Sequence, residues 1–208
     1  MQQAGPNAWN PAPGPLVNRS DEESKMSRVS QAEAQENRKR VVESASRLFR
    51  EKGVRDVSVA DVMQSVGMTQ GGFYKQFASK AALVEEATAR AFSEMLRYLA
   101  ALDDDHGGHD AAWSSLIDSY LAPEARDNPG SGCPAAGFAG DFARDPEWRD
   151  TYAAGVRDMA GWIAPGDTGL AALSTLVGAL LLARATADSP LSEEILRAAR
   201  KAAARLTD

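Results

Sequence analysis

Residues Gly67–Lys80 read GMTQGGFYKQFASK, and the organisation of the chain follows from this stretch. Its first glycine separates two short segments with helical spacing, Val59–Val66 and Thr69–Lys75. Gly71 and Gly72 fall inside the second segment, where each glycine costs about 1 kcal/mol relative to alanine. Helix propensity therefore does not explain them, whereas a helix face without side chains can approach the floor of a DNA groove. The sequence predicts a helix-turn-helix whose second helix reads DNA.

Polar residues around these two glycines have side chains suited to DNA. A glutamine such as Gln70 can hydrogen-bond to a base edge, whereas lysine and threonine can bind phosphate oxygens. Lys80 stands at the start of the next helix, where free backbone N–H groups already favour a phosphate. The predicted DNA-binding residues are Arg38, Ser58, Thr69, Gln70, Gly71, Gly72, Tyr74, Lys75, Gln76 and Lys80.

Helical spacing continues on both sides of this stretch. A helix is predicted from Arg38 to a stop at Gly53, and Ser58 is the predicted N-cap of the next helix. Ser79 is the predicted N-cap of a long helix that follows. The apolar residues on these helices are predicted to form a small core that does not touch DNA: Leu48, Phe49, Val62, Val66, Phe73 and Phe77. The basic residues Arg47, Arg50 and Lys52 are expected on a solvated face.

The rest of the chain is also helical in pattern. After a predicted loop over Asp103–Asp110, the helical segments are broken by proline and glycine. The predicted segments are Trp113–Leu121, Pro134–Ala143, Pro146–Ile163, Thr168–Ala187 and Pro190–Leu206. No run of residues alternates long enough to indicate a strand. The predicted fold class is all-α, with a three-helix helix-turn-helix domain followed by a helical bundle for ligand binding and dimerisation.

Composition divides the chain into three parts. Residues 1–30 contain four prolines among polar residues and are predicted to be a disordered arm. Residues 31–80 are predicted as the DNA-binding domain and residues 81–208 as the regulatory and dimerisation domain. The net charge of −6 hides an asymmetry, because residues 37–80 carry nine basic and four acidic residues, whereas residues 81–208 carry eleven and twenty. One end of the chain is therefore basic and suited to DNA, and the other is acidic.

Several features point to the cytoplasm. A single cysteine, Cys133, excludes an intramolecular disulfide and fits a reducing compartment. No apolar stretch follows a basic start in residues 1–36, so no secretion signal is expected. The most apolar window, Gly169–Ala183, is shorter than the roughly 20 residues of a membrane-spanning helix. We therefore expect a buried core helix there and no contact with a membrane.

The stretch Asn37–Leu83 resembles the DNA-binding domain of the tetracycline-repressor (TetR) family of transcriptional regulators. The resemblance rests on LFREKG at Leu48–Gly53, on the helix-turn-helix, and on the pattern Phe-Tyr-x-x-Phe-x-Ser-Lys that ends at Lys80. It implies an all-α homodimer with an amino-terminal DNA-binding domain. It also implies a divergent helical domain whose pocket binds a small molecule and thereby releases DNA.

The resemblance assigns roles to individual residues. It places Thr69, Gln70, Gly71 and Gly72 on the recognition helix, without assigning a particular DNA contact to any of them. It implies phosphate contacts for Tyr74 and Lys80. The chain departs from the family at Gln76, where the family commonly has histidine, so a charge-tunable contact is replaced by a neutral one.

The carboxyl-terminal half gives the architecture more readily than the ligand. The segment Thr168–Ala187 is apolar nearly all round, so we predict that it pairs with Pro190–Leu206 and with their copies in a second chain, as a four-helix interface. A monomeric core is the alternative. The predicted effector-binding residues are mostly aromatic and suggest an apolar or aromatic small molecule: Trp113, Leu116, Tyr120, Phe138, Phe142, Trp148, Tyr152 and Trp162.

Two further groups of residues are candidates for chemistry. Cys133 precedes a predicted helix start that would favour a thiolate, which makes it a candidate sensor of electrophiles or oxidants, with an inert thiol as the alternative. His106 and His109 lie among aspartates, but the adjacent glycines favour a solvated loop over a metal site. We expect no metal, no cofactor and no catalytic residue. The competing functions are a thiol-dependent enzyme that uses Cys133 and a DNA-binding protein without ligand switching.

Overall fold

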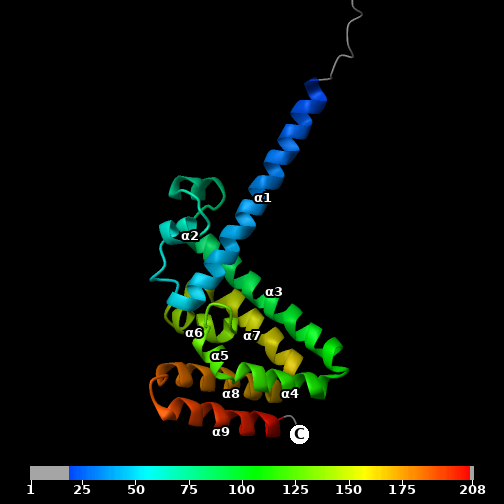
Figure 1. The fold of residues 1–208 in the computed structure, drawn as a ribbon, viewed down its shortest axis with the longest axis vertical. Helices are drawn as coiled ribbons and strands as arrows, with labels where there is room; N and C mark the ends of the chain where they lie inside the picture. The colour runs from blue at the N-terminus through cyan, green and yellow to red at the C-terminus, as the bar shows by residue number, and fades with distance from the viewer. Residues whose placement is uncertain (1–18, 207–208) are drawn as a thin grey trace, which may run out of the picture. The chain divides into compact units, whose positions relative to one another are not determined.

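The computed structural model describes residues 19–206, and this part of the chain is helical with no strand (Figure 1). The all-α prediction is confirmed. The elements in chain order are α1 (Arg19–Lys52), α2 (Val59–Ser65), the 3₁₀ helix η1 (Gln70–Lys75), α3 (Lys80–His106), α4 (His109–Tyr120), α5 (Pro123–Asp127), α6 (Pro134–Arg144), the 3₁₀ helix η2 (Pro146–Trp148), α7 (Arg149–Ile163), α8 (Asp167–Ala185) and α9 (Pro190–Leu206).

Helix α1 begins earlier than predicted. The expected disordered arm covered residues 1–30, but the backbone is helical from Arg19 onward. Residues 19–37 contain neither proline nor glycine and are rich in Glu, Gln, Ala, Lys and Arg, which have high helix propensity. A helix can therefore extend here without an apolar face. The remainder of that predicted arm, residues 1–18, lies outside the described residues.

Two buried apolar clusters organise residues 38–208, which form one compact unit. We call α1, α2, η1 and the start of α3 the head, and the first cluster, which these elements surround, the head core. It contains all but one of the six predicted core residues in buried positions, and Val66 packs against it half-buried. It also contains Phe138 and Phe142 of α6, which belong to the segment predicted as regulatory. The head core is thus completed by a helix from the other half of the chain.

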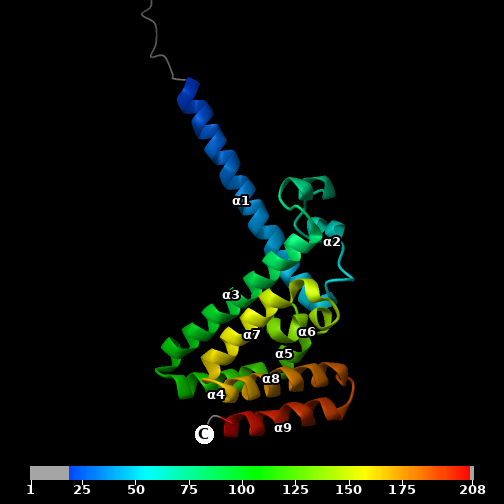
Figure 2. The same cartoon turned by 180° about the vertical axis from the view of Figure 1, so that it is seen from behind.

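The second cluster lies among α3, α4, α7, α8 and α9. Helix α3 joins the two clusters, because Leu83 and Val84 near its start are buried in the head core and Leu99 and Leu102 near its end are buried in the second. Figures 1 and 2 show α8 and α9 running side by side. These four residues make α3 the direct connection between the head core and the second cluster.

The structure corrects two of the predicted boundaries. The predicted loop Asp103–Asp110 is mostly helical, since α3 continues to His106 and α4 begins at His109. Only the two glycines between them break the helices, with Gly107 in the left-handed conformation at φ 71°. The short helix α5 was not predicted, because its five residues are too few to show a repeating apolar spacing.

Helix α8 is long and apolar enough to cross a membrane by length and composition, with a mean hydropathy of 1.6 over its most apolar window. One such helix is weak evidence, since core helices pass the same test. Seven of its residues are buried, and six of these belong to the second cluster. The opposite side leaves three leucines exposed, namely Leu170, Leu181 and Leu182. We call these three residues the α8 leucine patch.

Candidate DNA-binding face and effector cavity

Local signals in the sequence position the two helices of the helix-turn-helix. Ser58 caps α2, because its hydroxyl accepts a hydrogen bond from the Asp61 backbone N–H at 3.1 Å and the Asp61 carboxylate accepts one from the Ser58 N–H at 2.8 Å. Gly67 then takes a left-handed conformation at φ +74°, which turns the chain towards η1. Ser58 therefore acts in this structure as a helix cap that orients the first helix of the motif.

The two glycines of η1 have no structural reason to be glycine. Neither has a positive φ. A side chain at Gly71 would meet no atom within 4 Å, and one at Gly72 would meet only the end of Met63 at 3.6 Å. Neither turn geometry nor internal packing therefore excludes a larger residue here. Their small size leaves the backbone of η1 open to an external surface, as a close approach to a DNA groove requires.

The exposed residues of η1 and the residue before it form a continuous polar face, which we call the reading face. Phe73 and Phe77 stack on each other with ring centroids 5.2 Å apart and are buried in the head core. This anchoring turns the other side of η1 outwards, and the Tyr74 side chain is 68% exposed. The exposed residues of the reading face are Thr69, Gln70, Gly71, Tyr74 and Lys75.

Besides Ser58, three of the predicted DNA-binding residues make contacts inside the protein. Arg38 donates to the backbone oxygen of Gln76 and to the Glu86 carboxylate, and its guanidinium lies 4.1 Å from the centre of the Phe77 ring. The side-chain oxygen of Gln76 is buried without a hydrogen-bond partner in the described range. Arg38 thus holds the end of η1 against α1 and α3. Its predicted DNA contact, like that of Gln76, stays a prediction.

Lys80 is the third of these residues. Its ammonium group donates to the backbone oxygen of Val54 at 2.6 Å, and burial lowers the pKa of that group. The Ser79 hydroxyl caps α3 by accepting from the Ala82 backbone N–H at 3.1 Å, as predicted. Lys80 therefore fastens the loop between α1 and α2 to the start of α3. Part of its hydrogen-bonding capacity is used there rather than at the protein surface.

The head is linked to α6 by polar contacts as well as by the two phenylalanines. The Asp141 carboxylate accepts a hydrogen bond from the Val54 backbone N–H at 3.0 Å. Arg50 of α1 donates to the backbone oxygen of Gly132 at 2.6 Å, just before α6 begins. Hydrogen bonds therefore join α6 and the segment before it to Arg50 and Val54, which lie on either side of Gly53. A shift of α6 would directly move these two residues at the end of α1.

A cavity of about 770 Å³ lies between α1, α3, α4 and the segment that connects α5 to α6. Two of the predicted effector residues, Leu116 and Tyr120, line it. Arg47 and Arg50, which were expected on a solvated face, line it too. That expectation is wrong for Arg50, which is half-buried, because Gly137 leaves no side chain where the Arg50 stem packs.

The other predicted effector residues lie elsewhere. Phe138 and Phe142 are buried in the head core, and Trp148 packs against it. Trp113 and Trp162 line a cavity of about 380 Å³, and Tyr152 lines one of about 480 Å³. The sequence pattern found aromatic residues but did not separate core residues from cavity walls. The effector assignment of these residues stays a prediction.

Cys133 is a wall residue of the 770 Å³ cavity, but it is buried. Burial raises the pKa of the Cys133 thiol, although the Tyr120 hydroxyl and the first backbone N–H groups of α6 act in the opposite direction. The helix start alone would favour a thiolate, but burial has the larger effect, so the thiol is protonated at neutral pH. Its role as a redox sensor stays a prediction.

The two histidines lie at the other end of α3. His109 contacts the Asp103 carboxylate through Nδ1 and the Ile163 backbone oxygen through Nε2, both at 3.0 Å. Trp162 donates to the same carboxylate at 2.8 Å. Among the side chains that the structure describes, those of residues 30–206, no three His, Cys, Asp or Glu come together in a way that could hold a metal ion. The contacts of His109 are with α3 and α7, and neither histidine is among the residues that line the cavity with Cys133.

Together, a capped first helix, a glycine-opened second helix and its outward reading face define a helix-turn-helix DNA-binding protein. The family model described as "Bacterial regulatory proteins, tetR family" matches residues 41–87. The HTH-type transcriptional regulator Rv0196 of Mycobacterium tuberculosis (strain ATCC 25618 / H37Rv) is 31% identical over 173 residues, which cover 73% of this chain and 86% of that protein. The chain therefore belongs to the tetR family and is a DNA-binding transcriptional regulator.

Other similarities concern the DNA-binding end or the fold. The HTH-type transcriptional regulator TtgR of Pseudomonas putida is 40% identical over 60 residues, and the match covers only 29% of each chain. The crystal structure of the reduced form of E. coli NemR has a TM-score of 0.68 at 17% identity, covering 81% of this chain and 95% of that one. A TetR transcriptional regulator from Chloroflexus aurantiacus J-10-FL has a TM-score of 0.69 at 23% identity, covering 83% and 94%. These two structures show the shared fold.

Sequence reasoning missed the arginines of the cavity and the part that α6 plays in the head. The signal that was available is a set of glycines. A side chain at Gly130 would come within 2.9 Å of Arg47, and one at Gly137 within 2.6 Å of Arg50. These glycines let the loop and α6 pack directly on the stems of the two arginines. Without knowledge of which helix lies opposite, their spacing alone does not reveal the partner.

Proposed function

We propose that this regulator is a homodimeric repressor that binds a palindromic operator through its two reading faces and is released by a small-molecule effector. It would act in the cytoplasm, without enzymatic activity and without a membrane. The single observation that carries the DNA-binding part is the outward reading face around Gly71 and Gly72, where the backbone is open to an external surface. Repression, as opposed to activation, follows from the family resemblance.

The dimer is supported by the α8 leucine patch. Leu170, Leu181 and Leu182 are 46%, 38% and 59% exposed, although they lie on the helix with the most apolar composition. Leu191 and Leu206 of α9 are exposed as well, and α9 packs along α8. Apolar surface of this kind is buried in homodimer interfaces. In such a dimer, the two reading faces bind two half-sites that lie about one helical turn of DNA, roughly 34 Å, apart.

The ligand response is supported by the 770 Å³ cavity, whose size suits a small molecule. Its walls come from α1 of the head and from α3 and α4 of the bundle. A ligand that fits one relative position of these helices better than another would shift the protein towards that position. Because Arg50 of α1 is hydrogen-bonded to Gly132 just before α6, and Asp141 of α6 to Val54 just after α1, the shift would reach the head.

A direct test uses duplexes from the region upstream of the regulator's own gene. Binding of the purified protein is followed by fluorescence anisotropy at low and at moderate salt, with a scrambled duplex as control, and the mass of the complex is measured by analytical ultracentrifugation. We expect two chains per palindrome and a preference for the native duplex. Absence of binding to any duplex at low salt would contradict the proposal.

The same assay distinguishes the alternative of a DNA-binding protein without switching. Small aromatic, acidic and electrophilic compounds are added to the complex, and the loss of anisotropy is recorded. Release by at least one compound supports a ligand-responsive regulator. Binding that none of them relieves, at concentrations that saturate the protein in a separate binding measurement, favours the non-switching alternative.

A further inference from the structure

The 770 Å³ cavity contains a half-buried positive charge without a carboxylate partner. Arg50 makes two hydrogen bonds, from Nε to the Ser46 oxygen at 3.0 Å and from Nη1 to the Gly132 oxygen at 2.6 Å. Both acceptors are neutral backbone groups, and no carboxylate whose side chain the structure describes, from residue 30 to 206, forms an ion pair with it. Burial lowers the pKa of this guanidinium, as expected for a charge held away from water without a counter-ion. Buried charges in proteins are normally paired with an opposite charge. An anion bound in the cavity would give the Arg50 guanidinium the partner that it lacks.

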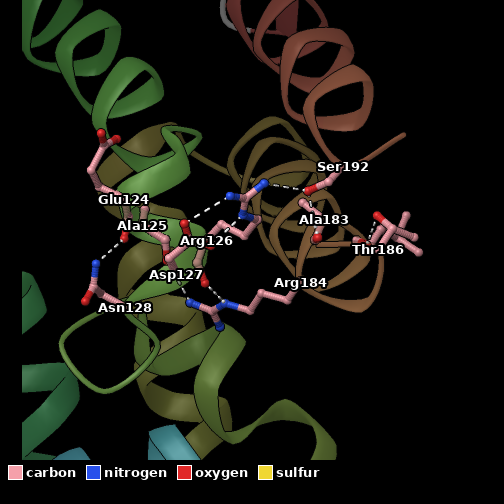
Figure 3. A network of polar contacts seen from close by, with 10 residues as sticks. Glu124, Ala125, Arg126, Asp127, Asn128, Ala183, Arg184, Thr186 and Ser192 are labelled. Atoms are coloured by element: carbon pink, nitrogen blue, oxygen red, sulfur yellow. Dashed lines mark hydrogen bonds and ion pairs between the residues drawn. The ribbon is translucent and has the colours of Figure 1, made fainter. Parts of the chain in front are cut away.

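A second arginine of the same kind lies behind the cavity wall. Arg184 of α8 donates from Nε to the backbone oxygen of Arg126 at 3.1 Å and from Nη2 to that of Ala125 at 3.0 Å (Figure 3). Its Nη2 is so near Gly132 that a side chain there would come within 3.2 Å. Arg184 also has only backbone acceptors among the described residues. The segment before α6 thus passes between two arginines that lack acidic partners.

The floor of the cavity offers uncharged donors next to these arginines. The Tyr120 hydroxyl is buried beside the Cys133 thiol and makes no hydrogen bond of normal geometry in the part of the chain that the structure describes. Helix α6 starts beside it at Pro134, and its first backbone N–H groups have the neutral Cys133 thiol as their neighbour and no charged side chain as a cap. The start of a helix carries partial positive charge that favours an anion. A buried hydroxyl and a helix start that both adjoin a neutral thiol therefore lie at the same end of the cavity as Arg50.

The acidic residues of the cavity are bonded to other arginines. Glu94 and Glu43 both line it, and Arg90 pairs with them at 2.6 Å and 3.3 Å. The charge of Glu94 raises the pKa of Arg50, but by less than burial lowers it. Arg47 is paired with Glu51 at 3.2 Å. Arg40, which also lines the cavity, is exposed and donates to the Val66 backbone oxygen at 2.9 Å. Arg50 is therefore the half-buried arginine of this cavity that forms no ion pair with a carboxylate, among the residues described.

We propose that this cavity binds an organic anion, a carboxylate on an aromatic or aliphatic body, with its charged end at Arg50 and the start of α6. The Tyr120 hydroxyl donates to the same end, and the body of the ligand lies along the apolar side chains of Met95 on α3 and Leu116 on α4. A planar carboxylate suits the donor geometry of a guanidinium, which is why arginine binds such groups well. This inference rests on the proposed function, because it assigns a chemical class to the effector of that cavity.

The test measures binding without DNA. The probe is 8-anilinonaphthalene-1-sulfonate, an aromatic anion that becomes fluorescent in an apolar site. It is displaced by three compounds that share one ring system and differ in charge: indole-3-acetate, indole-3-acetamide and tryptamine. We expect saturable binding of one probe per chain. Indole-3-acetate should displace it at a concentration at least tenfold lower than the neutral amide, and tryptamine should displace it least.

Variants assign this preference to the arginine. Arg50→Met should weaken probe binding at least tenfold and remove the difference between the acid and the amide, whereas Tyr120→Phe should weaken binding about threefold. Arg97→Met is the matched control, because Arg97 also donates from Nε to a backbone oxygen four residues earlier, at 3.4 Å, but lies outside this cavity. It should bind the probe as the wild type does. Circular dichroism checks that each variant is folded.

Three results would overturn the inference: no saturable probe binding to the wild type, equal displacement by acid and amide, or unchanged binding by a folded Arg50→Met. If Arg50→Met does not fold, the ranking of the three compounds on the wild type decides alone. Anisotropy with operator DNA then separates this inference from the proposed function. Carboxylate binding that leaves DNA bound contradicts the ligand response only. DNA release by neutral compounds, with no preference for the acid, contradicts the anion site only.

Discussion

Replacing Gly71 by alanine should change stability and DNA binding in opposite directions. A Cβ at this position meets no atom within 4 Å, and the residue has no positive φ, so the substitution introduces no internal clash. A glycine-to-alanine change at such a helical position stabilises a protein by about 0.5–1 kcal/mol. For a chain of this size, the midpoint of thermal unfolding should rise by about 1–4 °C.

DNA affinity should fall for the same reason that stability rises. If the backbone of η1 lies against the groove floor, the added methyl group occupies space that DNA needs. Overpacking of a close contact costs about 1–3 kcal/mol. In a dimer the cost arises at both reading faces, which gives about 2–6 kcal/mol, or a loss of roughly 30-fold or more in affinity. Thermal unfolding by circular dichroism and anisotropy titration of an operator duplex measure the two effects.

Gly161→Ala is the matched control, because Gly161 is helical, has no positive φ, and would also place its Cβ where no atom lies within 4 Å. It should stabilise the protein by a similar amount and leave DNA affinity unchanged. Wild-type affinity in a folded Gly71→Ala variant would refute the assignment of the reading face. A loss of stability in that variant would contradict the conclusion that a Cβ at Gly71 has free space around it.

Three further predictions concern specificity, assembly and pH. Gln70→Ala should chiefly reduce the preference for the operator over the scrambled duplex. Lys75→Ala should weaken binding to both duplexes and lower the slope of log affinity against log salt by about 1. Equal effects of the two variants on preference, affinity and salt slope would contradict these separate roles. Leu182→Glu places a charge in the α8 leucine patch and should shift ultracentrifugation towards the monomer and weaken operator binding at least tenfold, and a variant that stays dimeric would remove this patch from the interface. His109 has a raised pKa, with the acceptor on α7 as the first cause and the acidic groups of α3 and α4 adding to it, so its contribution is complete below the unfolded pKa of about 6.5 and is lost as pH rises through the folded pKa. His109→Gln should therefore lower the midpoint of thermal unfolding by more at pH 5.5 than at pH 8.5. An equal decrease at both pH values would contradict a stabilising contribution from protonated His109.

Features set by neighbours in sequence were predictable. The caps at Ser58 and Ser79, the turn at Gly67 and the paired Phe73 and Phe77 all act within a few residues, so their spacing is visible in the sequence. The helix-turn-helix and its outward face follow from these local signals. The long apolar pattern of the second half likewise predicted the later helices, with boundaries that differ from the observed ones by a few residues.

Features set by distant contacts were not predictable from one sequence. Phe138 and Phe142 have the spacing of any apolar helix face, and nothing local says that this face packs against the head and not against a ligand. Arg50 looks like any basic residue near a helix end until the Gly132 backbone is found beside it. Lys80 appears free to bind phosphate until Val54 is seen to accept its hydrogen bond. In each case the deciding neighbour is 26 or more residues away.

The two α6 phenylalanines inside the head core have a consequence for how such regulators can be recombined. A fragment that stops at the end of the helix-turn-helix would lack side chains that fill its interior, and the Val54 backbone would lose the Asp141 carboxylate. Exchanging DNA specificity between two relatives by cutting at residue 80 would leave a mismatched seam inside the hydrophobic interior. A chimera that keeps both halves intact has to transplant residues 38–80 together with residues 134–144, although they are separated along the polypeptide.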